Sequence, residues 1–121
     1  MTGKPHKKNR YGRERTLSTA VVGLNFRMSP ALQEEVAERT PLLVSLVREP
    51  KNDHDPNAIM VVLDELRPGM HIGYLTRGVA EKMAPVIDSG DVRILASTLT
   101  ELDGHGSGEV FISFARKKIS L

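Results

Sequence analysis

Short runs of β-branched and other apolar residues, broken by glycine, proline and Asx turns, constrain the fold of this chain most. Runs of this length and composition are typical of strands, and the turn residues between them are typical of tight connections. The predicted strands cover residues 18–26, 41–48, 57–63, 70–75, 91–102 and 109–117. The pattern therefore predicts a mainly β protein.

Two segments carry helix signals instead. Ser29 can cap a short helix that begins at Pro30 and ends before Pro41. Thr76 can cap a longer helix that ends at Gly90, and its apolar residues share one face at helical spacing. At 121 residues the chain is long enough for one domain with its own core. Six strands and two helices predict an antiparallel barrel or sandwich.

Basic residues are unevenly distributed along the chain. Residues 1–16 hold six Lys or Arg against one Glu, whereas residues 17–121 hold 11 basic and 14 acidic residues. We therefore predict a basic N-terminal arm at residues 1–16 and one folded domain at residues 17–121. The arm is expected to be disordered, because its composition cannot offset an ordering entropy of about 1–2 kcal/mol per residue. A solvated tail and an arm that binds phosphate backbones are both compatible with this charge.

Residues 49–57 interrupt two strands with a loop in which seven of nine residues are polar or charged. In the plainest explanation the side chains of Asp53, Asp55 and Asn57 only bond nearby backbone groups, with two prolines stiffening the loop, and this explanation suits Asp53 and Asn57 best. A turn gives no reason for a ring at His54 or for a second acid at Asp55. This pair is therefore a candidate functional site.

Motifs for metal binding and for catalysis are missing. The Asp residues of the loop begin like a calcium-binding loop, but Ala58 stands where that loop needs glycine, and the flanks are strands rather than helices. The chain has no cysteine, and it has no serine-hydrolase, phosphate-loop or zinc-protease motif. We therefore predict no metal, no cofactor and no enzymatic activity. The sequence also has no signal peptide and no apolar run long enough to cross a membrane, so we expect a soluble, intracellular protein.

Three motifs give the sequence a resemblance to a known family. AVVGLNF, LVREPKNDHDPNAIMVV and HIGYLTRGVAEKMAPVIDSG, at residues 20–26, 46–62 and 71–90, together resemble a HIRAN domain over roughly residues 19–115. The resemblance implies a six-stranded, antiparallel OB-like β-barrel with two helices. It also implies a module that binds the 3′ end of single-stranded DNA in DNA repair, at replication forks or in phage DNA metabolism.

The resemblance further implies a setting and a partner. Such domains are attached to Swi/Snf-type helicases and also occur alone in bacteria and phages. We therefore expect a cytoplasmic, nucleoid-associated protein of a bacterium or a phage-infected cell. A helicase or nuclease would be supplied in trans.

The resemblance assigns roles to individual residues. Phe26 matches an aromatic residue that stacks on the terminal base, and His54 stands where the family usually has tyrosine. Asp55 matches the acid that accepts the 3′-hydroxyl. Tyr74 and Arg77 match positions that contact phosphate.

Some of these positions depart from the family pattern or have a plainer explanation. Asn25 occupies a position where a phosphate-binding arginine is common, and Arg27 is a nearby basic residue that could reach the same phosphate. Phe26 could belong to the core, and Tyr74 could bury its ring and bond a carbonyl group. Arg77 lies in a first helical turn, where an acid would suit the helix dipole better, so this position favours a bound anion.

Two other classes of function stay open. The alternative is a protein-interaction adaptor that uses the same barrel without nucleic acid, and a metal-dependent nuclease comes third. The sequence does not determine the DNA-processing machinery, the choice between DNA and RNA or the oligomeric state.

Overall fold

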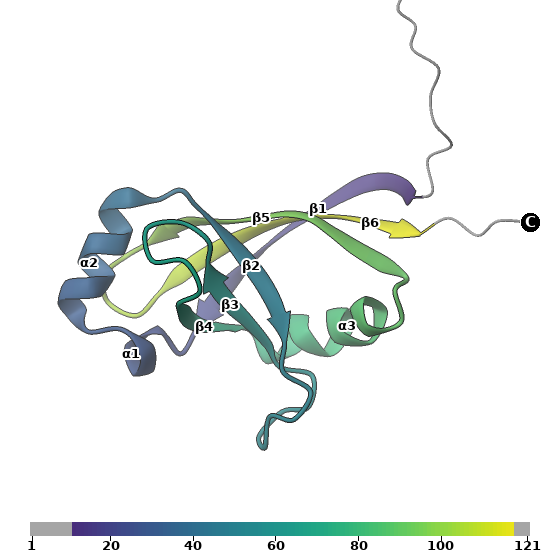
Figure 1. Ribbon diagram of the computed structural model, residues 1–121, viewed down its shortest axis with the longest axis horizontal. Coiled ribbons are helices and arrows are strands. Elements are labelled where there is room, and N and C mark those ends of the chain that lie inside the picture. The colour runs from purple at the N-terminus through teal and green to yellow at the C-terminus, as the bar shows by residue number, and fades with distance from the viewer. Residues whose placement is uncertain (1–10, 118–121) are drawn as a thin grey trace, which may run out of the picture.

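The computed structural model describes residues 11–117, which form a closed six-stranded antiparallel barrel with three helices (Figure 1). The strands are β1 (Tyr11–Val22), β2 (Leu42–Arg48), β3 (Ile59–Leu63), β4 (His71–Leu75), β5 (Val92–Leu102) and β6 (Gly108–Lys117). The helices are α1 (Leu24–Arg27), α2 (Pro30–Arg39) and α3 (Arg77–Asp88). The predicted mainly β barrel is confirmed.

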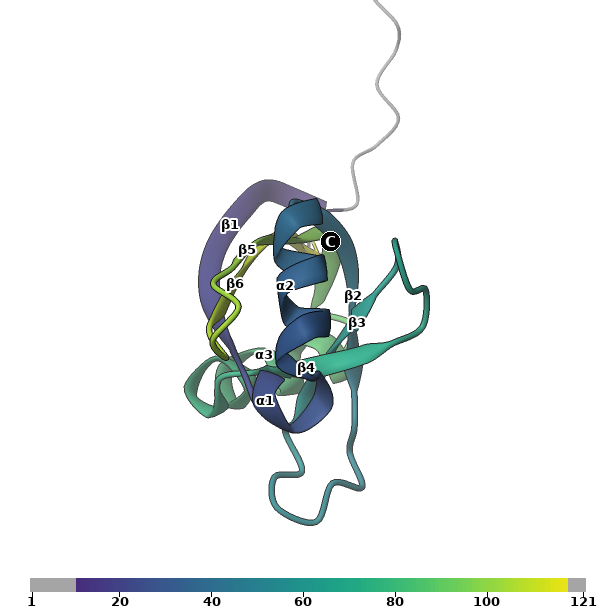
Figure 2. The ribbon, with the colours of Figure 1, turned by 90° about the vertical axis from the view of Figure 1, so that its left-hand side faces the viewer.

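The strand order around the barrel is β1-β4-β3-β2-β5-β6. The long strands β1, β5 and β6 run side by side along the longest axis, and α3 lies at the opposite end from α1 and α2 (Figure 1). Figure 2 shows α2 lying across one end of the barrel, in front of the strands. Each helix therefore covers an end of the barrel rather than a flat sheet face.

The core comes from alternate residues of the strands, as the period of two requires. Ile59, Val61 and Leu63 of β3 are fully buried, and so are Val110 and Ile112 of β6. The helices add further apolar side chains to the same core, among them Val36, Ala80, Met83 and Ala84. One continuous core therefore fixes the strands and helices that carry the candidate site.

The first strand begins earlier than the sequence predicts. β1 starts at Tyr11, and its early residues pair with the end of β6, for example Arg15 with Phe114. The predicted disorder is therefore wrong for residues 11–16, because β6 offers backbone partners that composition alone does not show. Residues 1–10 of the predicted arm lie outside the described residues.

The first strand also ends earlier than predicted, and a third helix follows it. β1 stops at Val22, and Gly23 adopts a left-handed conformation with φ 81° that few residues other than glycine tolerate. The chain then forms the single-turn helix α1, which buries Leu24 completely. Phe26 is consequently a helical residue and not the end of a strand.

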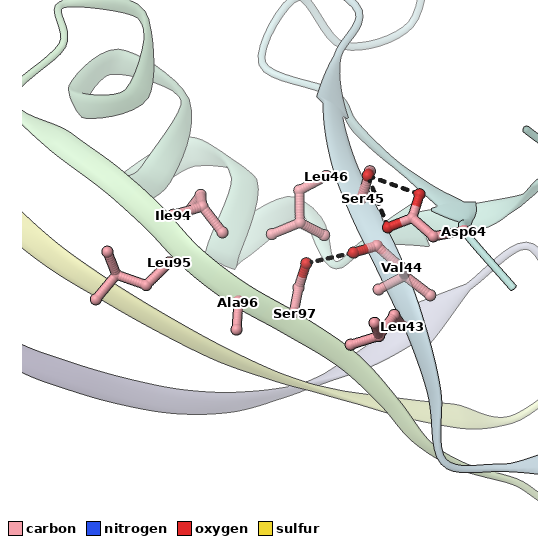
Figure 3. Close-up of a pocket in the computed structure, with 9 residues that line it drawn as sticks. All are labelled: Leu43, Val44, Ser45, Leu46, Asp64, Ile94, Leu95, Ala96 and Ser97. Carbon is pink, nitrogen blue, oxygen red and sulfur yellow. Dashed lines mark hydrogen bonds between the residues drawn. The ribbon is translucent and has the colours of Figure 1, made fainter.

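The barrel closes with few backbone pairs at the seam between β2 and β5. These strands pair only at Leu42 with Leu99 and at Leu43 with Thr98. Beyond these pairs lies a hollow of about 410 Å³, across which the Ser97 hydroxyl donates to the carbonyl oxygen of Val44 at 2.7 Å (Figure 3). None of the predicted site residues lines this hollow.

No helix within residues 11–117 is long and apolar enough to cross a membrane.

Candidate functional site

A second hollow, of about 280 Å³, brings together most of the predicted site residues. It is lined by Val22, Asn52, His54, Asp55, Ala58, Tyr74, Leu75 and Arg77. The loop between β2 and β3 (residues 49–58) supplies one wall, and β4 with the first turn of α3 supplies another. These segments meet because β3 pairs with β4 and because α3 follows β4 directly.

Asn52 organises the tip of the loop. Its Oδ1 atom accepts hydrogen bonds from the backbone N–H groups of His54 at 2.8 Å and of Asp55 at 2.9 Å. Asp55 continues the pattern, since its Oδ1 accepts from the backbone N–H of Asn57 at 2.9 Å. Of the side chains that the sequence suggests for turns, Asp55 makes one, and Asn52 rather than Asp53 or Asn57 makes the other.

The Asp55 carboxylate has one oxygen fixed by the loop and the other directed toward a cation. Its Oδ2 atom lies 3.7 Å from Nε of Arg77, and only 19% of its side chain is exposed. The guanidinium of Arg77 also donates to the backbone oxygen of His54 at 3.2 Å. The Arg77 side chain is still 73% exposed, so it can meet an anion from solvent.

Tyr74 is committed to a carboxylate within the protein. Its hydroxyl donates to Oε1 of Glu49 at 2.8 Å, and Nδ2 of Asn52 donates to the same oxygen at 2.6 Å. These two bonds, with the one from Asn52 the larger cause, hold the pKa of Glu49 below its ordinary value. Burial, followed by the bond to Glu49, raises the pKa of Tyr74. At neutral pH the pair is therefore a charged Glu49 and a neutral Tyr74.

Two further side chains fix the Tyr74 ring. The ring of His71 meets it edge-on with 4.7 Å between centroids, and Cζ of Arg27 lies 5.9 Å from the ring centroid. Burial is the main cause that lowers the pKa of His71. Its Nε2 atom donates to the carbonyl oxygen of Gly73 at 2.8 Å, because that partner can only accept. Arg27 is therefore the cation of α1 that stands beside Tyr74.

Asn25 belongs to a different cluster. Its Oδ1 accepts from Nε2 of Gln33 at 2.8 Å, and Oε1 of the almost fully buried Gln33 accepts from the backbone N–H of Gly106 at 2.9 Å. A Cβ atom at Gly106 would clash with the Asn25 amide. Asn25 thus joins α1 to α2 and to the β5–β6 turn, and it does not line the 280 Å³ hollow.

Phe26 is not part of the core. Its side chain is 94% exposed, which rules out the plainer explanation given above. It does not line the hollow, but it lies on α1, between Asn25 and Arg27, and α1 packs against β4. Its role as a stacking residue stays a prediction.

Sequence reasoning missed Glu49 and Asn52. Glu49 accepts from Tyr74, and Asn52 shapes the loop beside His54 and Asp55. The only signal that could have indicated them was the unusual polar density of their loop. Within residues 11–117 the side chains form no group of three or more His, Cys, Asp or Glu that could hold a metal ion.

Comparison with known families gives this arrangement a context. The model of the HIRAN domain family matches residues 15–107. The chain belongs to the HIRAN family. The resemblance seen in three sequence motifs is thereby confirmed.

Solved HIRAN domains share the fold. The crystal structure of the HIRAN domain of human HLTF aligns with a TM-score of 0.69 at 23% identity, over 85% of this chain and 77% of that one. The NMR structure of the HLTF HIRAN domain in its DNA-bound conformation aligns with a TM-score of 0.60 at 21% identity, over 85% and 76%. At this level of identity the likeness establishes the barrel fold.

A curated relative shows how small a part of a larger protein this domain can be. A Fanconi-associated nuclease 1 homolog of Oryza sativa subsp. japonica is 33% identical over 72 residues. The match covers 60% of this chain but only 7% of the rice protein.

Proposed function

We propose that this HIRAN domain is a non-catalytic module that binds the 3′ end of single-stranded DNA in the 280 Å³ hollow. One observation carries the proposal: the Asp55 carboxylate and the exposed Arg77 guanidinium stand side by side at the same hollow, next to His54. A solved HIRAN domain of HLTF in a DNA-bound conformation supports nucleic-acid binding by this fold.

The carboxylate and the guanidinium suit different parts of a terminal nucleotide. A 3′-hydroxyl can donate a hydrogen bond to the Asp55 oxygen that faces Arg77, whereas a 3′-phosphate at the same place would be repelled. Arg77 can pair with the phosphate that links the terminal nucleotide to its neighbour. The site would therefore distinguish a free 3′-hydroxyl from a blocked end.

The base would use the apolar and aromatic parts of the same region. Val22, Ala58 and Leu75 give the hollow apolar walls, and the exposed His54 offers a flat ring at its margin. Phe26 can provide a second ring, and stacking of a base on an aromatic side chain contributes about 1–3 kcal/mol. Stacking of this kind tolerates any base, so we propose end recognition without sequence preference.

In this proposal Arg27, and not Asn25, binds a phosphate of the DNA strand. The Asn25 amide is bonded to Gln33, away from the residues that line the hollow. Arg27 has its guanidinium beside Tyr74, and Tyr74 lines the hollow. The Tyr74 hydroxyl is bonded to Glu49, so Tyr74 contributes its ring to the hollow rather than a free hydroxyl.

The proposed setting is DNA repair, replication-fork processing or phage DNA metabolism, with a helicase or nuclease as partner. The Fanconi-associated nuclease homolog supports this setting, because a protein named as a nuclease contains a segment similar to this chain. Incubation of labelled DNA with the protein and magnesium or manganese is expected to leave the DNA intact. Cleavage would contradict a purely binding role.

The deciding experiment compares two oligonucleotides that carry a 5′ fluorophore and end in a 3′-hydroxyl or a 3′-phosphate. Fluorescence anisotropy is expected to show tighter binding of the hydroxyl end by the unchanged protein. Asp55→Asn keeps the shape of the side chain but removes the charge, so it should abolish the preference. Asp53→Asn, at the neighbouring exposed acid, is the matched control and should leave it unchanged. Equal affinities of the unchanged protein for the two ends would contradict the proposal.

A protein-interaction adaptor is the second candidate. The β2–β5 seam favours it, because Leu43 and Leu95 are 51% and 46% exposed beside the 410 Å³ hollow. An adaptor would bind its partner with little dependence on salt, and changes at Phe26 or His54 would not weaken it. The anisotropy experiment separates the two candidates.

A further inference from the structure

Arg48, the last residue of β2, makes more side-chain hydrogen bonds than a strand end needs. Its Nε and Nη2 atoms donate to the two carboxylate oxygens of Asp88, both at 2.9 Å. Its Nη1 donates to the backbone oxygen of Ala58 at 2.7 Å, and Nη2 also donates to that of Pro56 at 2.9 Å. Only 14% of the side chain is exposed.

These partners belong to the two walls of the candidate site. Pro56 and Ala58 lie on the returning part of the loop, directly after Asp55. Asp88 is the last residue of α3, whereas Arg77, at the other end of this 12-residue helix, contacts His54 and Asp55. The two attachments are therefore separated by about 16 Å along the helix. The loop is held against α3 at both ends of the helix.

We propose that Arg48 is a positioning residue for recognition of the 3′ end. By holding the returning loop and the end of α3 in one guanidinium fork, it fixes the Asp55 carboxylate relative to the Arg77 guanidinium. The proposal rests on the function proposed above, because it names a residue that tunes that same site without touching the ligand.

The fork needs arginine rather than any cation. A guanidinium is planar and presents five donors in fixed directions, so it can bind a carboxylate with two bonds and still reach two carbonyl groups. A lysine keeps the charge opposite Asp88 but offers a single nitrogen atom. Arg48→Lys therefore removes the geometry of the fork while it preserves the charge.

The loop keeps its own internal bonds without Arg48. The backbone N–H of Glu49 donates to the oxygen of Ala58 at 3.0 Å, and the N–H of Ala58 donates to the oxygen of Asp55 at 3.0 Å. The substitution is therefore expected to loosen the loop relative to α3 and to leave the barrel folded. A role in overall stability alone predicts the opposite, a uniform loss across the core.

The experiment uses the full chain with Arg48→Lys and measures three quantities. These are the affinity ratio for 3′-hydroxyl over 3′-phosphate oligonucleotides, the thermal midpoint and hydrogen exchange of single amides by NMR. The preference should fall about tenfold, which is the effect of weakening one charged hydrogen bond. The amides of His54, Asp55 and Asn57 should exchange faster, while those of β3 and β6 stay unchanged.

Arg67→Lys is the matched control, because Arg67 also forms an arginine–carboxylate pair, with Glu35 at 3.2 Å, but on another part of the barrel. It should change neither the preference nor the exchange of the loop. Asp88→Asn is a second variant, which keeps the carbonyl bonds of Arg48 and should show a smaller effect. It also serves if Arg48→Lys does not fold.

The outcomes separate this proposal from the proposed function. If the unsubstituted protein shows no preference for the 3′-hydroxyl end, the proposed function is wrong. The hydrogen-exchange data then still show whether Arg48 positions the loop. Unchanged loop exchange in Arg48→Lys, or equally faster exchange throughout the barrel, would overturn the positioning role. So would a preserved preference in a variant whose loop has loosened.

Discussion

Phe26 is a large apolar side chain that is left almost entirely in solvent. Because 94% of it is exposed, Phe26→Ala is expected to change the free energy of unfolding by less than about 0.5 kcal/mol. The same change should weaken binding of single-stranded DNA by about 1–3 kcal/mol through the loss of a stacking ring. Urea unfolding and anisotropy measure the two effects.

Phe111 provides the control for Phe26. It is 40% exposed and lies between Ser18 and Thr98 in the sheet. Phe111→Ala should reduce stability through lost cross-strand packing and should leave DNA affinity unchanged. Equal DNA affinities for Phe26→Ala and the unchanged protein would remove Phe26 from the site.

The pKa of Glu49 is lowered because Asn52 and Tyr74 donate hydrogen bonds to its charged form. A pKa lowered by folding stabilises the protein above the ordinary value of 4.5, and that stabilisation is lost as the pH falls through the lowered value. Tyr74→Phe removes one donor and should raise the pKa of Glu49 toward normal. It should also reduce the stability difference between pH 7 and pH 3.

The carboxyl carbon shift of Glu49, followed by NMR against pH, measures this effect directly. Asn52→Ala should raise the pKa of Glu49 further than Tyr74→Phe, because the bond from Asn52 is the larger cause. An unchanged titration in Tyr74→Phe would show that the hydroxyl does not hold the carboxylate.

At the scale of elements, β1 and β4 approach each other closely at Gly73. A Cβ atom at Gly73 would lie 2.6 Å from the carbonyl oxygen of Val22 and 2.9 Å from Cγ1 of Val21. Gly73→Ala therefore forces the two strands apart and should cost about 1–3 kcal/mol of stability. Urea unfolding followed by circular dichroism measures it.

Gly78 is the matched control within the neighbouring helix. A Cβ atom there meets nothing within 4 Å, and the residue lies in the first turn of α3. Gly78→Ala should therefore stabilise the protein by about 0.5–1 kcal/mol. If the two substitutions changed stability by similar amounts, the close approach of the strands at Gly73 would not be what makes glycine necessary there.

Strands such as β3 could be predicted from sequence, but α1 could not. β3 is a run of five apolar residues, three of them β-branched, and this composition predicts a strand, although its alternation of buried and half-buried residues is seen only in the structure. α1 has four residues, no side-chain cap and no acid in its first turn. It forms because Gly23 turns the chain and because Leu24 is buried in the core, and both depend on the rest of the fold.

The same limit applies to the candidate site. The motifs indicated His54, Asp55, Tyr74 and Arg77, and the structure places all four around one hollow. The motifs could not show that Asn25 faces Gln33, because that contact depends on how α2 and the β5–β6 turn pack. Local chemistry was readable from sequence, whereas the direction of a side chain required the tertiary structure.

For the whole molecule, the structure shows where some of the basic residues near the N-terminus lie. The early residues of β1 pair with the last residues of β6, so Arg13 and Arg15 lie on the strand next to Arg116 and Lys117. All four side chains are exposed. These four exposed basic residues therefore place positive charge at this end of the sheet, although residues 17–121 are acidic overall. This charge can attract a phosphate backbone before the 3′ end reaches the hollow.

This charge predicts a strong dependence of DNA binding on salt. Contacts with four to six phosphates of a single strand give a slope of about −3 to −4 for the logarithm of affinity against that of salt concentration. Arg15→Gln with Arg116→Gln should make the slope less steep by about 1.4, since each phosphate contact contributes about 0.7. The double variant should weaken binding of 3′-hydroxyl and 3′-phosphate oligonucleotides equally, unlike Asp55→Asn.

Arg39→Gln, at the end of α2, is the control and should leave the slope unchanged. Anisotropy titrations from 50 to 200 mM salt, roughly the range over which such contacts are screened, measure the slope. A slope near zero would contradict binding to a phosphate backbone and would favour the adaptor.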